Sequence, residues 1–145
     1  PPFCLRNETY LWLPVIVALL VFLSHRFLPK IEQPLLYLDA IGLGTFVVIG
    51  TGKAIALQTG PLGAVLMGVM TGTAGGVFRD ILSNEVPLIM RREIYASACI
   101  FGGALLVLLQ RFSVANELAL LIAATSVIIL RLLAIQLNWS LPKAT

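Results

Sequence analysis

The residues best suited to chemistry lie in a glycine-rich stretch, GVMTGTAGGVFRD, at residues 68–80. Gly68, Gly72 and Gly76 recur at every fourth position, so in a helix they would share one face. Small residues at this spacing let two helices approach closely in a membrane. Close helix packing is therefore one interpretation, and for Gly68 and Gly72 it would be sufficient.

The neighbouring pair Gly75-Gly76 favours a second interpretation. Two adjacent glycines weaken a helix without adding a packing face, so we expect the helix to unwind and kink there and to line a cavity. Freed carbonyl groups at membrane depth are tolerated where protein buries them or water reaches them. Such carbonyls can coordinate a cation in place of its hydration shell. Thr71 and Thr73 would add hydroxyl oxygens to such a cavity.

Four charged residues are candidates for mouth or gating charges. Arg79 and Asp80 close the glycine-rich stretch. They could form an electrostatic latch with another helix at the cytoplasmic mouth, or extend to the membrane surface from a helix end. Asp39 lies in an apolar run, where a carboxylate indicates a functional site, although a place near a helix N-terminus would also suit it. Lys53 could face a pore and repel cations, or extend to the lipid headgroups.

Composition indicates which solvent surrounds these residues. The chain of 145 residues is 59% hydrophobic and 12% charged, with a mean hydropathy of +0.97, whereas a water-soluble domain carries roughly a quarter charged residues. Ten Lys and Arg residues give a basic pI near 9.2, but they are scattered at segment ends, which argues against nucleic acid as a partner. We therefore expect a membrane protein with lipid as its partner.

The elements that must position the candidate residues are apolar segments of about 20 residues, the length that crosses a bilayer as a helix. Connections between them are short. The five predicted spans are residues 10–28, 35–55, 61–78, 95–110 and 116–137.

A repeated motif organises these spans. Residues 2–10, PFCLRNETY, recur without a gap as residues 87–95, PLIMRREIY. Three spans separate the two copies, and an odd number makes the copies inverted across the membrane, as in many transporters. We therefore expect residues 1–33 to be the third helix of a first unit, 34–112 an inverted three-helix unit, and 113–145 an extra seventh helix with a tail. The first two helices of the first unit would precede Pro1, so that the sequence is truncated to about five spans.

The loop charges predict an orientation. Arg26, Lys30, Arg79, Arg91, Arg92 and Lys143 would lie on one side of the membrane, and Arg6, Lys53 and Arg111 on the other. Since positive charge concentrates on the cytoplasmic side, we expect the C-terminus in the cytoplasm.

Signals of an enzyme are absent from the sequence. His25 is the one histidine, and Cys4 and Cys99 lie in different contexts, so neither a histidine-based metal cluster nor a disulfide framework is indicated. No phosphate-binding loop or hydrolase motif occurs. We expect no enzyme and no cofactor.

Together these features resemble the trimeric intracellular cation channel (TRIC) family in its short prokaryotic form. The stretch TAGGVFRD at 73–80 and the Pro-x-x-x-Arg-x-Glu-x-Tyr pattern at 87–95 carry the resemblance, which covers nearly all of residues 2–137. It implies a homotrimer in a prokaryotic inner membrane, in which each subunit holds its own pore for monovalent cations, chiefly potassium. In that family the second and fifth helices are kinked at glycines and line the pore. Carried over to this chain, the resemblance implies an ion path lined by Thr71, Gly72, Thr73, Gly75 and Gly76.

The same prokaryotic sequences are also grouped under a glycine-transporter (UPF0126) domain name, which keeps a second function open. Unwound glycine amides could hold the carboxylate of an amino acid as readily as carbonyls hold potassium. A carrier of glycine or another small amino acid is therefore the first alternative to a channel, and a membrane scaffold without transport is the second.

Overall fold

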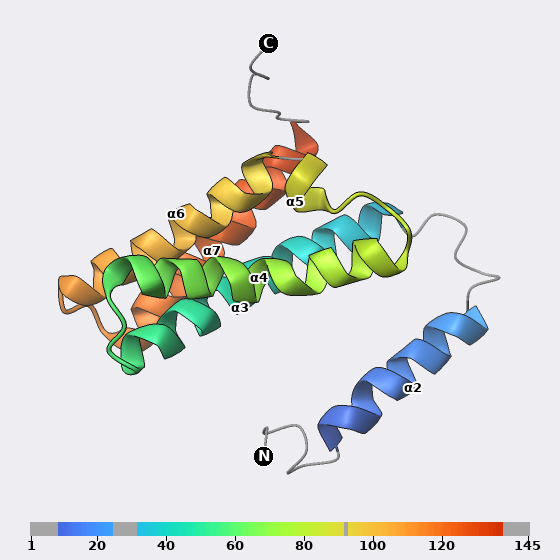
Figure 1. Ribbon diagram of the computed structural model, residues 1–145, viewed down its shortest axis with the longest axis horizontal. Helices are drawn as coiled ribbons and strands as arrows, with labels where there is room; N and C mark the ends of the chain where they lie inside the picture. The colour runs from blue at the N-terminus through green and yellow to red at the C-terminus, as the bar shows by residue number, and fades with distance from the viewer. Residues whose placement is uncertain (1–8, 25–31, 92, 138–145) are drawn as a thin grey trace. The chain divides into compact units, whose positions relative to one another are not determined.

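The computed structural model describes residues 9–24, 32–91 and 93–137, and the regular secondary structure of these residues is α-helical (Figure 1). The helices are α2 (Thr9–Ser24), α3 (Glu32–Ala56), α4 (Pro61–Leu82), α5 (Leu88–Arg91), α6 (Glu93–Arg111) and α7 (Asn116–Gln136). The all-α fold class is confirmed.

The chain forms two compact units, residues 1–34 and residues 35–145. The first contains α2, a helix of 16 residues that is apolar and exposed along nearly its whole length. The predicted span 10–28 continues past its end. Cys4, Arg6, His25, Arg26 and Lys30 lie outside the described residues, as do most of the first copy of the repeat, Arg92, and the tail with Lys143.

Among the described residues, four helices are long and apolar enough to cross a membrane: Pro34–Ala56, Pro61–Leu82, Ile94–Arg111 and Asn116–Gln136. They confirm the predicted spans 35–55, 61–78, 95–110 and 116–137. Two details differ. Helix α4 continues to Leu82, so Arg79 and Asp80 lie within it, and the short helix α5 precedes α6. The assignment of residues 1–33, 34–112 and 113–145 to repeat units remains a prediction.

Tight turns bring successive spans back through the bundle. After α3, α4 and α6 the chain passes through a residue with positive φ: Gln58, Asn84 and Ser113. After α3, for example, Thr59 N donates to Ala54 O and Gln58 N to Ile55 O, the pair of bonds that closes a helix C-terminus. The spans therefore alternate in direction, which places the ends of α3 and α6 and the starts of α4 and α7 at one end of the bundle.

Glycines let these helices pack closely. A side chain on Gly68 would collide with Thr51 of α3, and a Cβ on Gly72 would lie 2.5 Å from Val47 Cγ2. A side chain on Gly102 of α6 would collide with Val127 of α7. The close-packing interpretation of Gly68 and Gly72 is thereby confirmed.

The predicted unwinding at Gly75-Gly76 is wrong. Helix α4 is α-helical without a break from Pro61 to Leu82, and the described glycines all have negative φ. A glycine in a helix costs about 1 kcal/mol relative to alanine. Each backbone group left unpaired in hydrocarbon costs several kcal/mol, so the helix stays intact.

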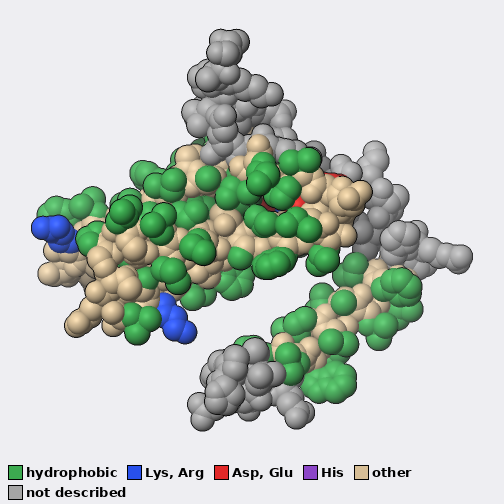
Figure 2. All heavy atoms as spheres, viewed as in Figure 1, with side chains coloured by type: hydrophobic (Ala, Val, Ile, Leu, Met, Phe, Trp, Pro, Cys, Tyr) green, Lys and Arg blue, Asp and Glu red, His purple; other side chains and the backbone are tan. Residues whose placement is uncertain are grey.

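Hydrophobic side chains are spread over the visible described surface (Figure 2). Large apolar residues are exposed on every long helix, including Phe22, Phe46, Phe78, Phe101 and Leu121. In water such a surface would cause aggregation, whereas hydrocarbon is its ordinary surrounding. The chain is a multi-pass membrane protein.

Candidate functional site

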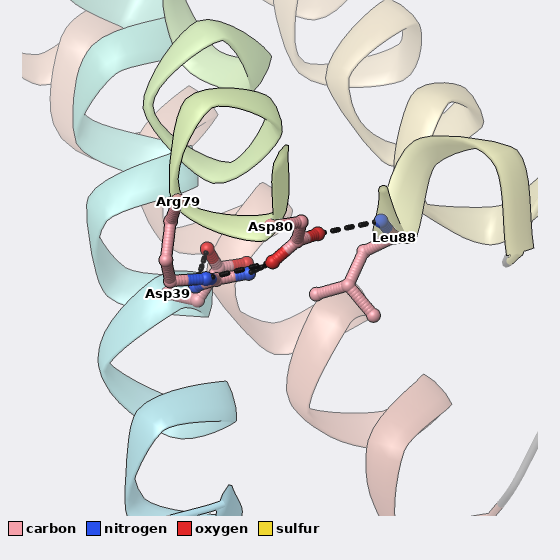
Figure 3. A network of polar contacts seen from close by, with 4 residues as sticks. All are labelled: Asp39, Arg79, Asp80 and Leu88. Atoms are coloured by element: carbon pink, nitrogen blue, oxygen red, sulfur yellow. Dashed lines mark hydrogen bonds and ion pairs between the residues drawn. The ribbon is translucent and has the colours of Figure 1, made fainter. Parts of the chain in front are cut away.

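A network of charged side chains ties three helices together at the end of the bundle where α4 finishes (Figure 3). Arg79 NH1 lies 2.7 Å from Asp39 Oδ1 of α3. The same guanidinium reaches Asp80 Oδ1, with Nε at 2.9 Å and NH2 at 2.8 Å. The second oxygen of Asp80, Oδ2, accepts a hydrogen bond from Leu88 N at the start of α5, at 2.7 Å.

The burial of these side chains makes the network important for the stability of the protein. The side chains of Asp39 and Asp80 are 7% and 6% exposed, and that of Arg79 is 26% exposed. An ion pair on a protein surface contributes little, but a buried carboxylate that loses its cation is strongly destabilising. Of the two alternatives for Arg79, the contacts show the pairing with another helix, and the Asp39 side chain lies in the protein interior rather than at an open interface.

Tyr95 of α6 and Arg131 of α7 extend the network. Both side chains are fully buried, and the Arg131 guanidinium carbon lies 4.8 Å from the centre of the Tyr95 ring, a cation–π arrangement. The Tyr95 hydroxyl lies beside the Asp39 carboxylate. Together, Arg79 and Arg131 balance the charges of Asp39 and Asp80.

Gly76 makes room for these polar groups. A Cβ at this position would lie 2.6 Å from the Tyr95 hydroxyl oxygen and 3.3 Å from Asp39 Oδ1. Gly75, by contrast, would place a Cβ in open space with nothing within 4 Å. The two neighbouring glycines therefore lie in different surroundings, which the sequence alone does not distinguish.

The predicted path residues do not share one surface. Gly72, Thr73 and Gly76 are buried, Thr71 is half-buried, and Gly75 is exposed. Both threonine hydroxyls donate to carbonyls of their own helix, Thr71 to Met67 O at 2.7 Å and Thr73 to Val69 O at 2.8 Å. These hydroxyls still have oxygen lone pairs available to a cation.

Thr71, Gly75 and Arg79 follow one another at intervals of four along α4 and so share a face. A Cβ on Gly50 of α3 would lie 2.6 Å from Thr71 Oγ1, and Lys53, which is exposed, follows Gly50 by one turn. We call Lys53, Thr71, Gly75 and Arg79 the polar stripe. Lys53 and Arg79 are its two basic members.

Sequence reasoning missed Tyr95 and Arg131. Arg131 interrupts the most hydrophobic of the four spans, and an arginine inside an apolar helix is costly enough to indicate a buried partner. The position of Arg131 could therefore have been recognised from the sequence. Tyr95 carried no such signal beyond its place in the repeated motif.

The arrangement defines a class of protein known from solved structures, the TRIC channels. The fold matches a channel from a study of conductance through TRIC cation channels with a TM-score of 0.87 and 38% identity, covering 100% of this chain and 71% of that one. It also matches the TRIC trimeric intracellular cation channel orthologue from Rhodobacter sphaeroides, with a TM-score of 0.88 and 35% identity, covering 96% and 72% of the two chains.

Sequence comparison gives the family. Residues 36–111 match the family model described as Glycine transporter. The chain is 41% identical to the UPF0126 inner membrane protein YadS of Escherichia coli K12 over 98% of this chain and 70% of that protein. It is 39% identical to a UPF0126 membrane protein of Vibrio cholerae, covering 98% and 60%. The chain belongs to this UPF0126 glycine-transporter family, and its structural neighbours are ion channels rather than enzymes.

Proposed function

We propose that this protein is a channel for monovalent cations, chiefly potassium, and that it acts as a homotrimer with one pore in each subunit. The observation that carries the proposal is the similarity of fold and sequence to TRIC cation channels, at a TM-score of 0.87 and 38% identity. Potassium would be the permeant ion, with no cofactor. We place the C-terminus in the cytoplasm, on the side of the Asp39–Arg79–Asp80 network.

We assign the ion path to the polar stripe. Among the predicted path residues, Thr71 and Gly75 would contact the permeating ions, because they are the ones not fully buried. Gly72, Thr73 and Gly76 would hold α4 against its neighbours. Asp39 and Asp80 would keep Arg79 at the cytoplasmic mouth, where its partial exposure lets the guanidinium face ions.

Gly75→Leu tests this path. The structure leaves open space at Gly75, so the variant should fold, while its side chain should obstruct ions moving along the stripe. We expect single-channel recordings in planar bilayers to show unitary potassium currents for the wild-type protein and at least a tenfold lower conductance for the variant. Unchanged conductance would contradict the path, and a wild-type protein without potassium flux or glycine uptake would support a scaffold.

The family name keeps glycine transport as a second candidate. A carrier would take up labelled glycine into proteoliposomes and show no unitary currents, because an occluded site moves substrate in discrete cycles. Recording currents and glycine uptake from the same purified protein distinguishes the two functions. Glycine uptake without currents would overturn the channel proposal.

Neutralising Lys53 should increase potassium conductance. A fixed positive charge at one end of a cation path raises the barrier to entry, so we expect Lys53→Gln to raise unitary conductance roughly twofold at low ionic strength. The increase should shrink as KCl is raised, because salt screens exposed charges. Arg111→Gln provides the control, since Arg111 is also an exposed basic residue at this end of the bundle but lies outside the stripe. Equal effects of the two variants on conductance would exclude Lys53 from the path.

A further inference from the structure

An apolar groove lies at the end of the bundle opposite the charged network. Its volume is about 730 Å³, within the range of roughly 300–1,000 Å³ typical of sites for small molecules. Apolar side chains of α3, α4 and α6 form its walls, and Thr59, Gln110 and Arg111 are its polar lining residues. The apolar lining residues are Ile55, Pro61, Leu62, Val65, Ile100, Ala104, Val107 and Leu108.

The length of the groove matches one leaflet of a bilayer. Along α6 it extends from Ile100 to Arg111, and at about 1.5 Å per residue these positions are about 16 Å apart. The hydrocarbon core of a bilayer is roughly 30 Å thick, so one leaflet is about half of that. A chain that entered beside Arg111 would therefore end near Ile100, close to the middle of the membrane.

A molecule that binds in this groove must differ from the surrounding lipid in its charge. Acyl chains gain little by leaving bulk hydrocarbon for an apolar groove, because both surroundings are equally apolar. Selectivity for one lipid over another must therefore come from the end of the groove that faces the lipid headgroups, where Arg111 lines it. The Gln110 side chain is held there by a 2.8 Å hydrogen bond to Asn116 Oδ1. A guanidinium binds a phosphate oxygen through paired donors.

We propose that this groove binds one anionic phospholipid, with an acyl chain along α6 and the phosphate on Arg111. The lipid belongs to the leaflet at which α4 begins and α6 ends. It would fill the space between the two helices and hold their ends at a constant separation. This site is separate from the polar stripe and does not depend on ion conduction.

Native mass spectrometry of the purified full chain tests the proposal with phosphatidylglycerol and phosphatidylcholine of identical acyl chains. We expect one bound phosphatidylglycerol, preferred over phosphatidylcholine by roughly five- to tenfold, the contribution of one basic residue at a membrane surface. Arg111→Gln should remove the preference. Ala104→Phe, which adds a ring to an exposed groove residue, should prevent binding of either lipid.

Matched variants control for general effects. Lys53→Gln also removes an exposed basic residue, and Ala74→Phe also adds a ring to an exposed alanine, but neither position lines the groove. Both should bind phosphatidylglycerol as the wild-type protein does. Equal binding of the two lipids, retained binding by Ala104→Phe, or a loss that Ala74→Phe reproduces would each overturn the proposal. If Ala104→Phe fails to fold, Arg111→Gln at the exposed helix end still decides it.

Discussion

Replacing Asp80 with alanine is expected to lower the free energy of unfolding by about 3 kcal/mol, the effect of breaking a buried ion pair from one side. The variant removes both contacts with Arg79 and leaves Leu88 N, which is buried, without its acceptor. Arg79 keeps Asp39 as a partner and is partly exposed, so the loss should lie near the lower end of the range for buried pairs. Thermal unfolding in detergent, followed by circular dichroism, measures the change.

Two further variants isolate the cause. Asp80→Asn keeps an oxygen acceptor but not the charge, so it should lose less stability than Asp80→Ala. Glu85→Ala removes an exposed carboxylate five residues further along, and surface charges contribute about 0–1 kcal/mol. If Asp80→Ala shifts the unfolding midpoint no more than Glu85→Ala does, the network is not a significant source of stability.

Alanine substitutions at Gly75 and Gly76 are expected to have opposite effects on stability. At both positions alanine favours the helix by roughly 0.5–1 kcal/mol. At Gly75 the added methyl group meets open space, so the variant should be more stable than the wild-type protein. At Gly76 the methyl group would lie 2.6 Å from the Tyr95 hydroxyl oxygen, and overpacking a core costs about 1–3 kcal/mol.

The Tyr95 ring has little freedom to move away, because it is buried beneath the Arg131 guanidinium. Tyr95→Phe removes the hydroxyl that clashes, so combining it with Gly76→Ala should recover part of the lost stability. Unfolding midpoints of the two single variants, compared in the same detergent, test the contrast. A shift of the same sign and size at Gly75 and Gly76 would show that the contact with Tyr95 does not determine the effect.

The sequence predicted the membrane spans accurately, but it predicted the structural role of the glycines only in part. The predicted span 116–137 differs from α7, Asn116–Gln136, by one residue at its end, because bilayer thickness restricts the length of an apolar helix. The spacing of Gly68, Gly72 and Gly76 also predicted a shared packing face. Unwinding at Gly75-Gly76 was the error, because glycine propensity was given more weight than the cost of unpaired backbone in hydrocarbon.

The charged network shows where local sequence is insufficient. Arg79 and Asp80 were identified as a possible latch, but the partner Asp39 lies 40 positions away in the chain. Which carboxylate meets the guanidinium depends on the depth and rotation of α3 relative to α4. Those are set by how Thr51 and Val47 pack against Gly68 and Gly72.

The sequence by itself determined that this is a multi-pass helical membrane protein, where its spans lie and which family it resembles. These properties follow from hydropathy, segment length and a short motif, all of which are local. The tertiary structure alone decided that Gly76 is enclosed and Gly75 open, that Tyr95 and Arg131 join the network, and that a groove ends at Arg111. Each depends on contacts between helices distant in the chain, and the rotation of one helix against another cannot be obtained from either helix alone.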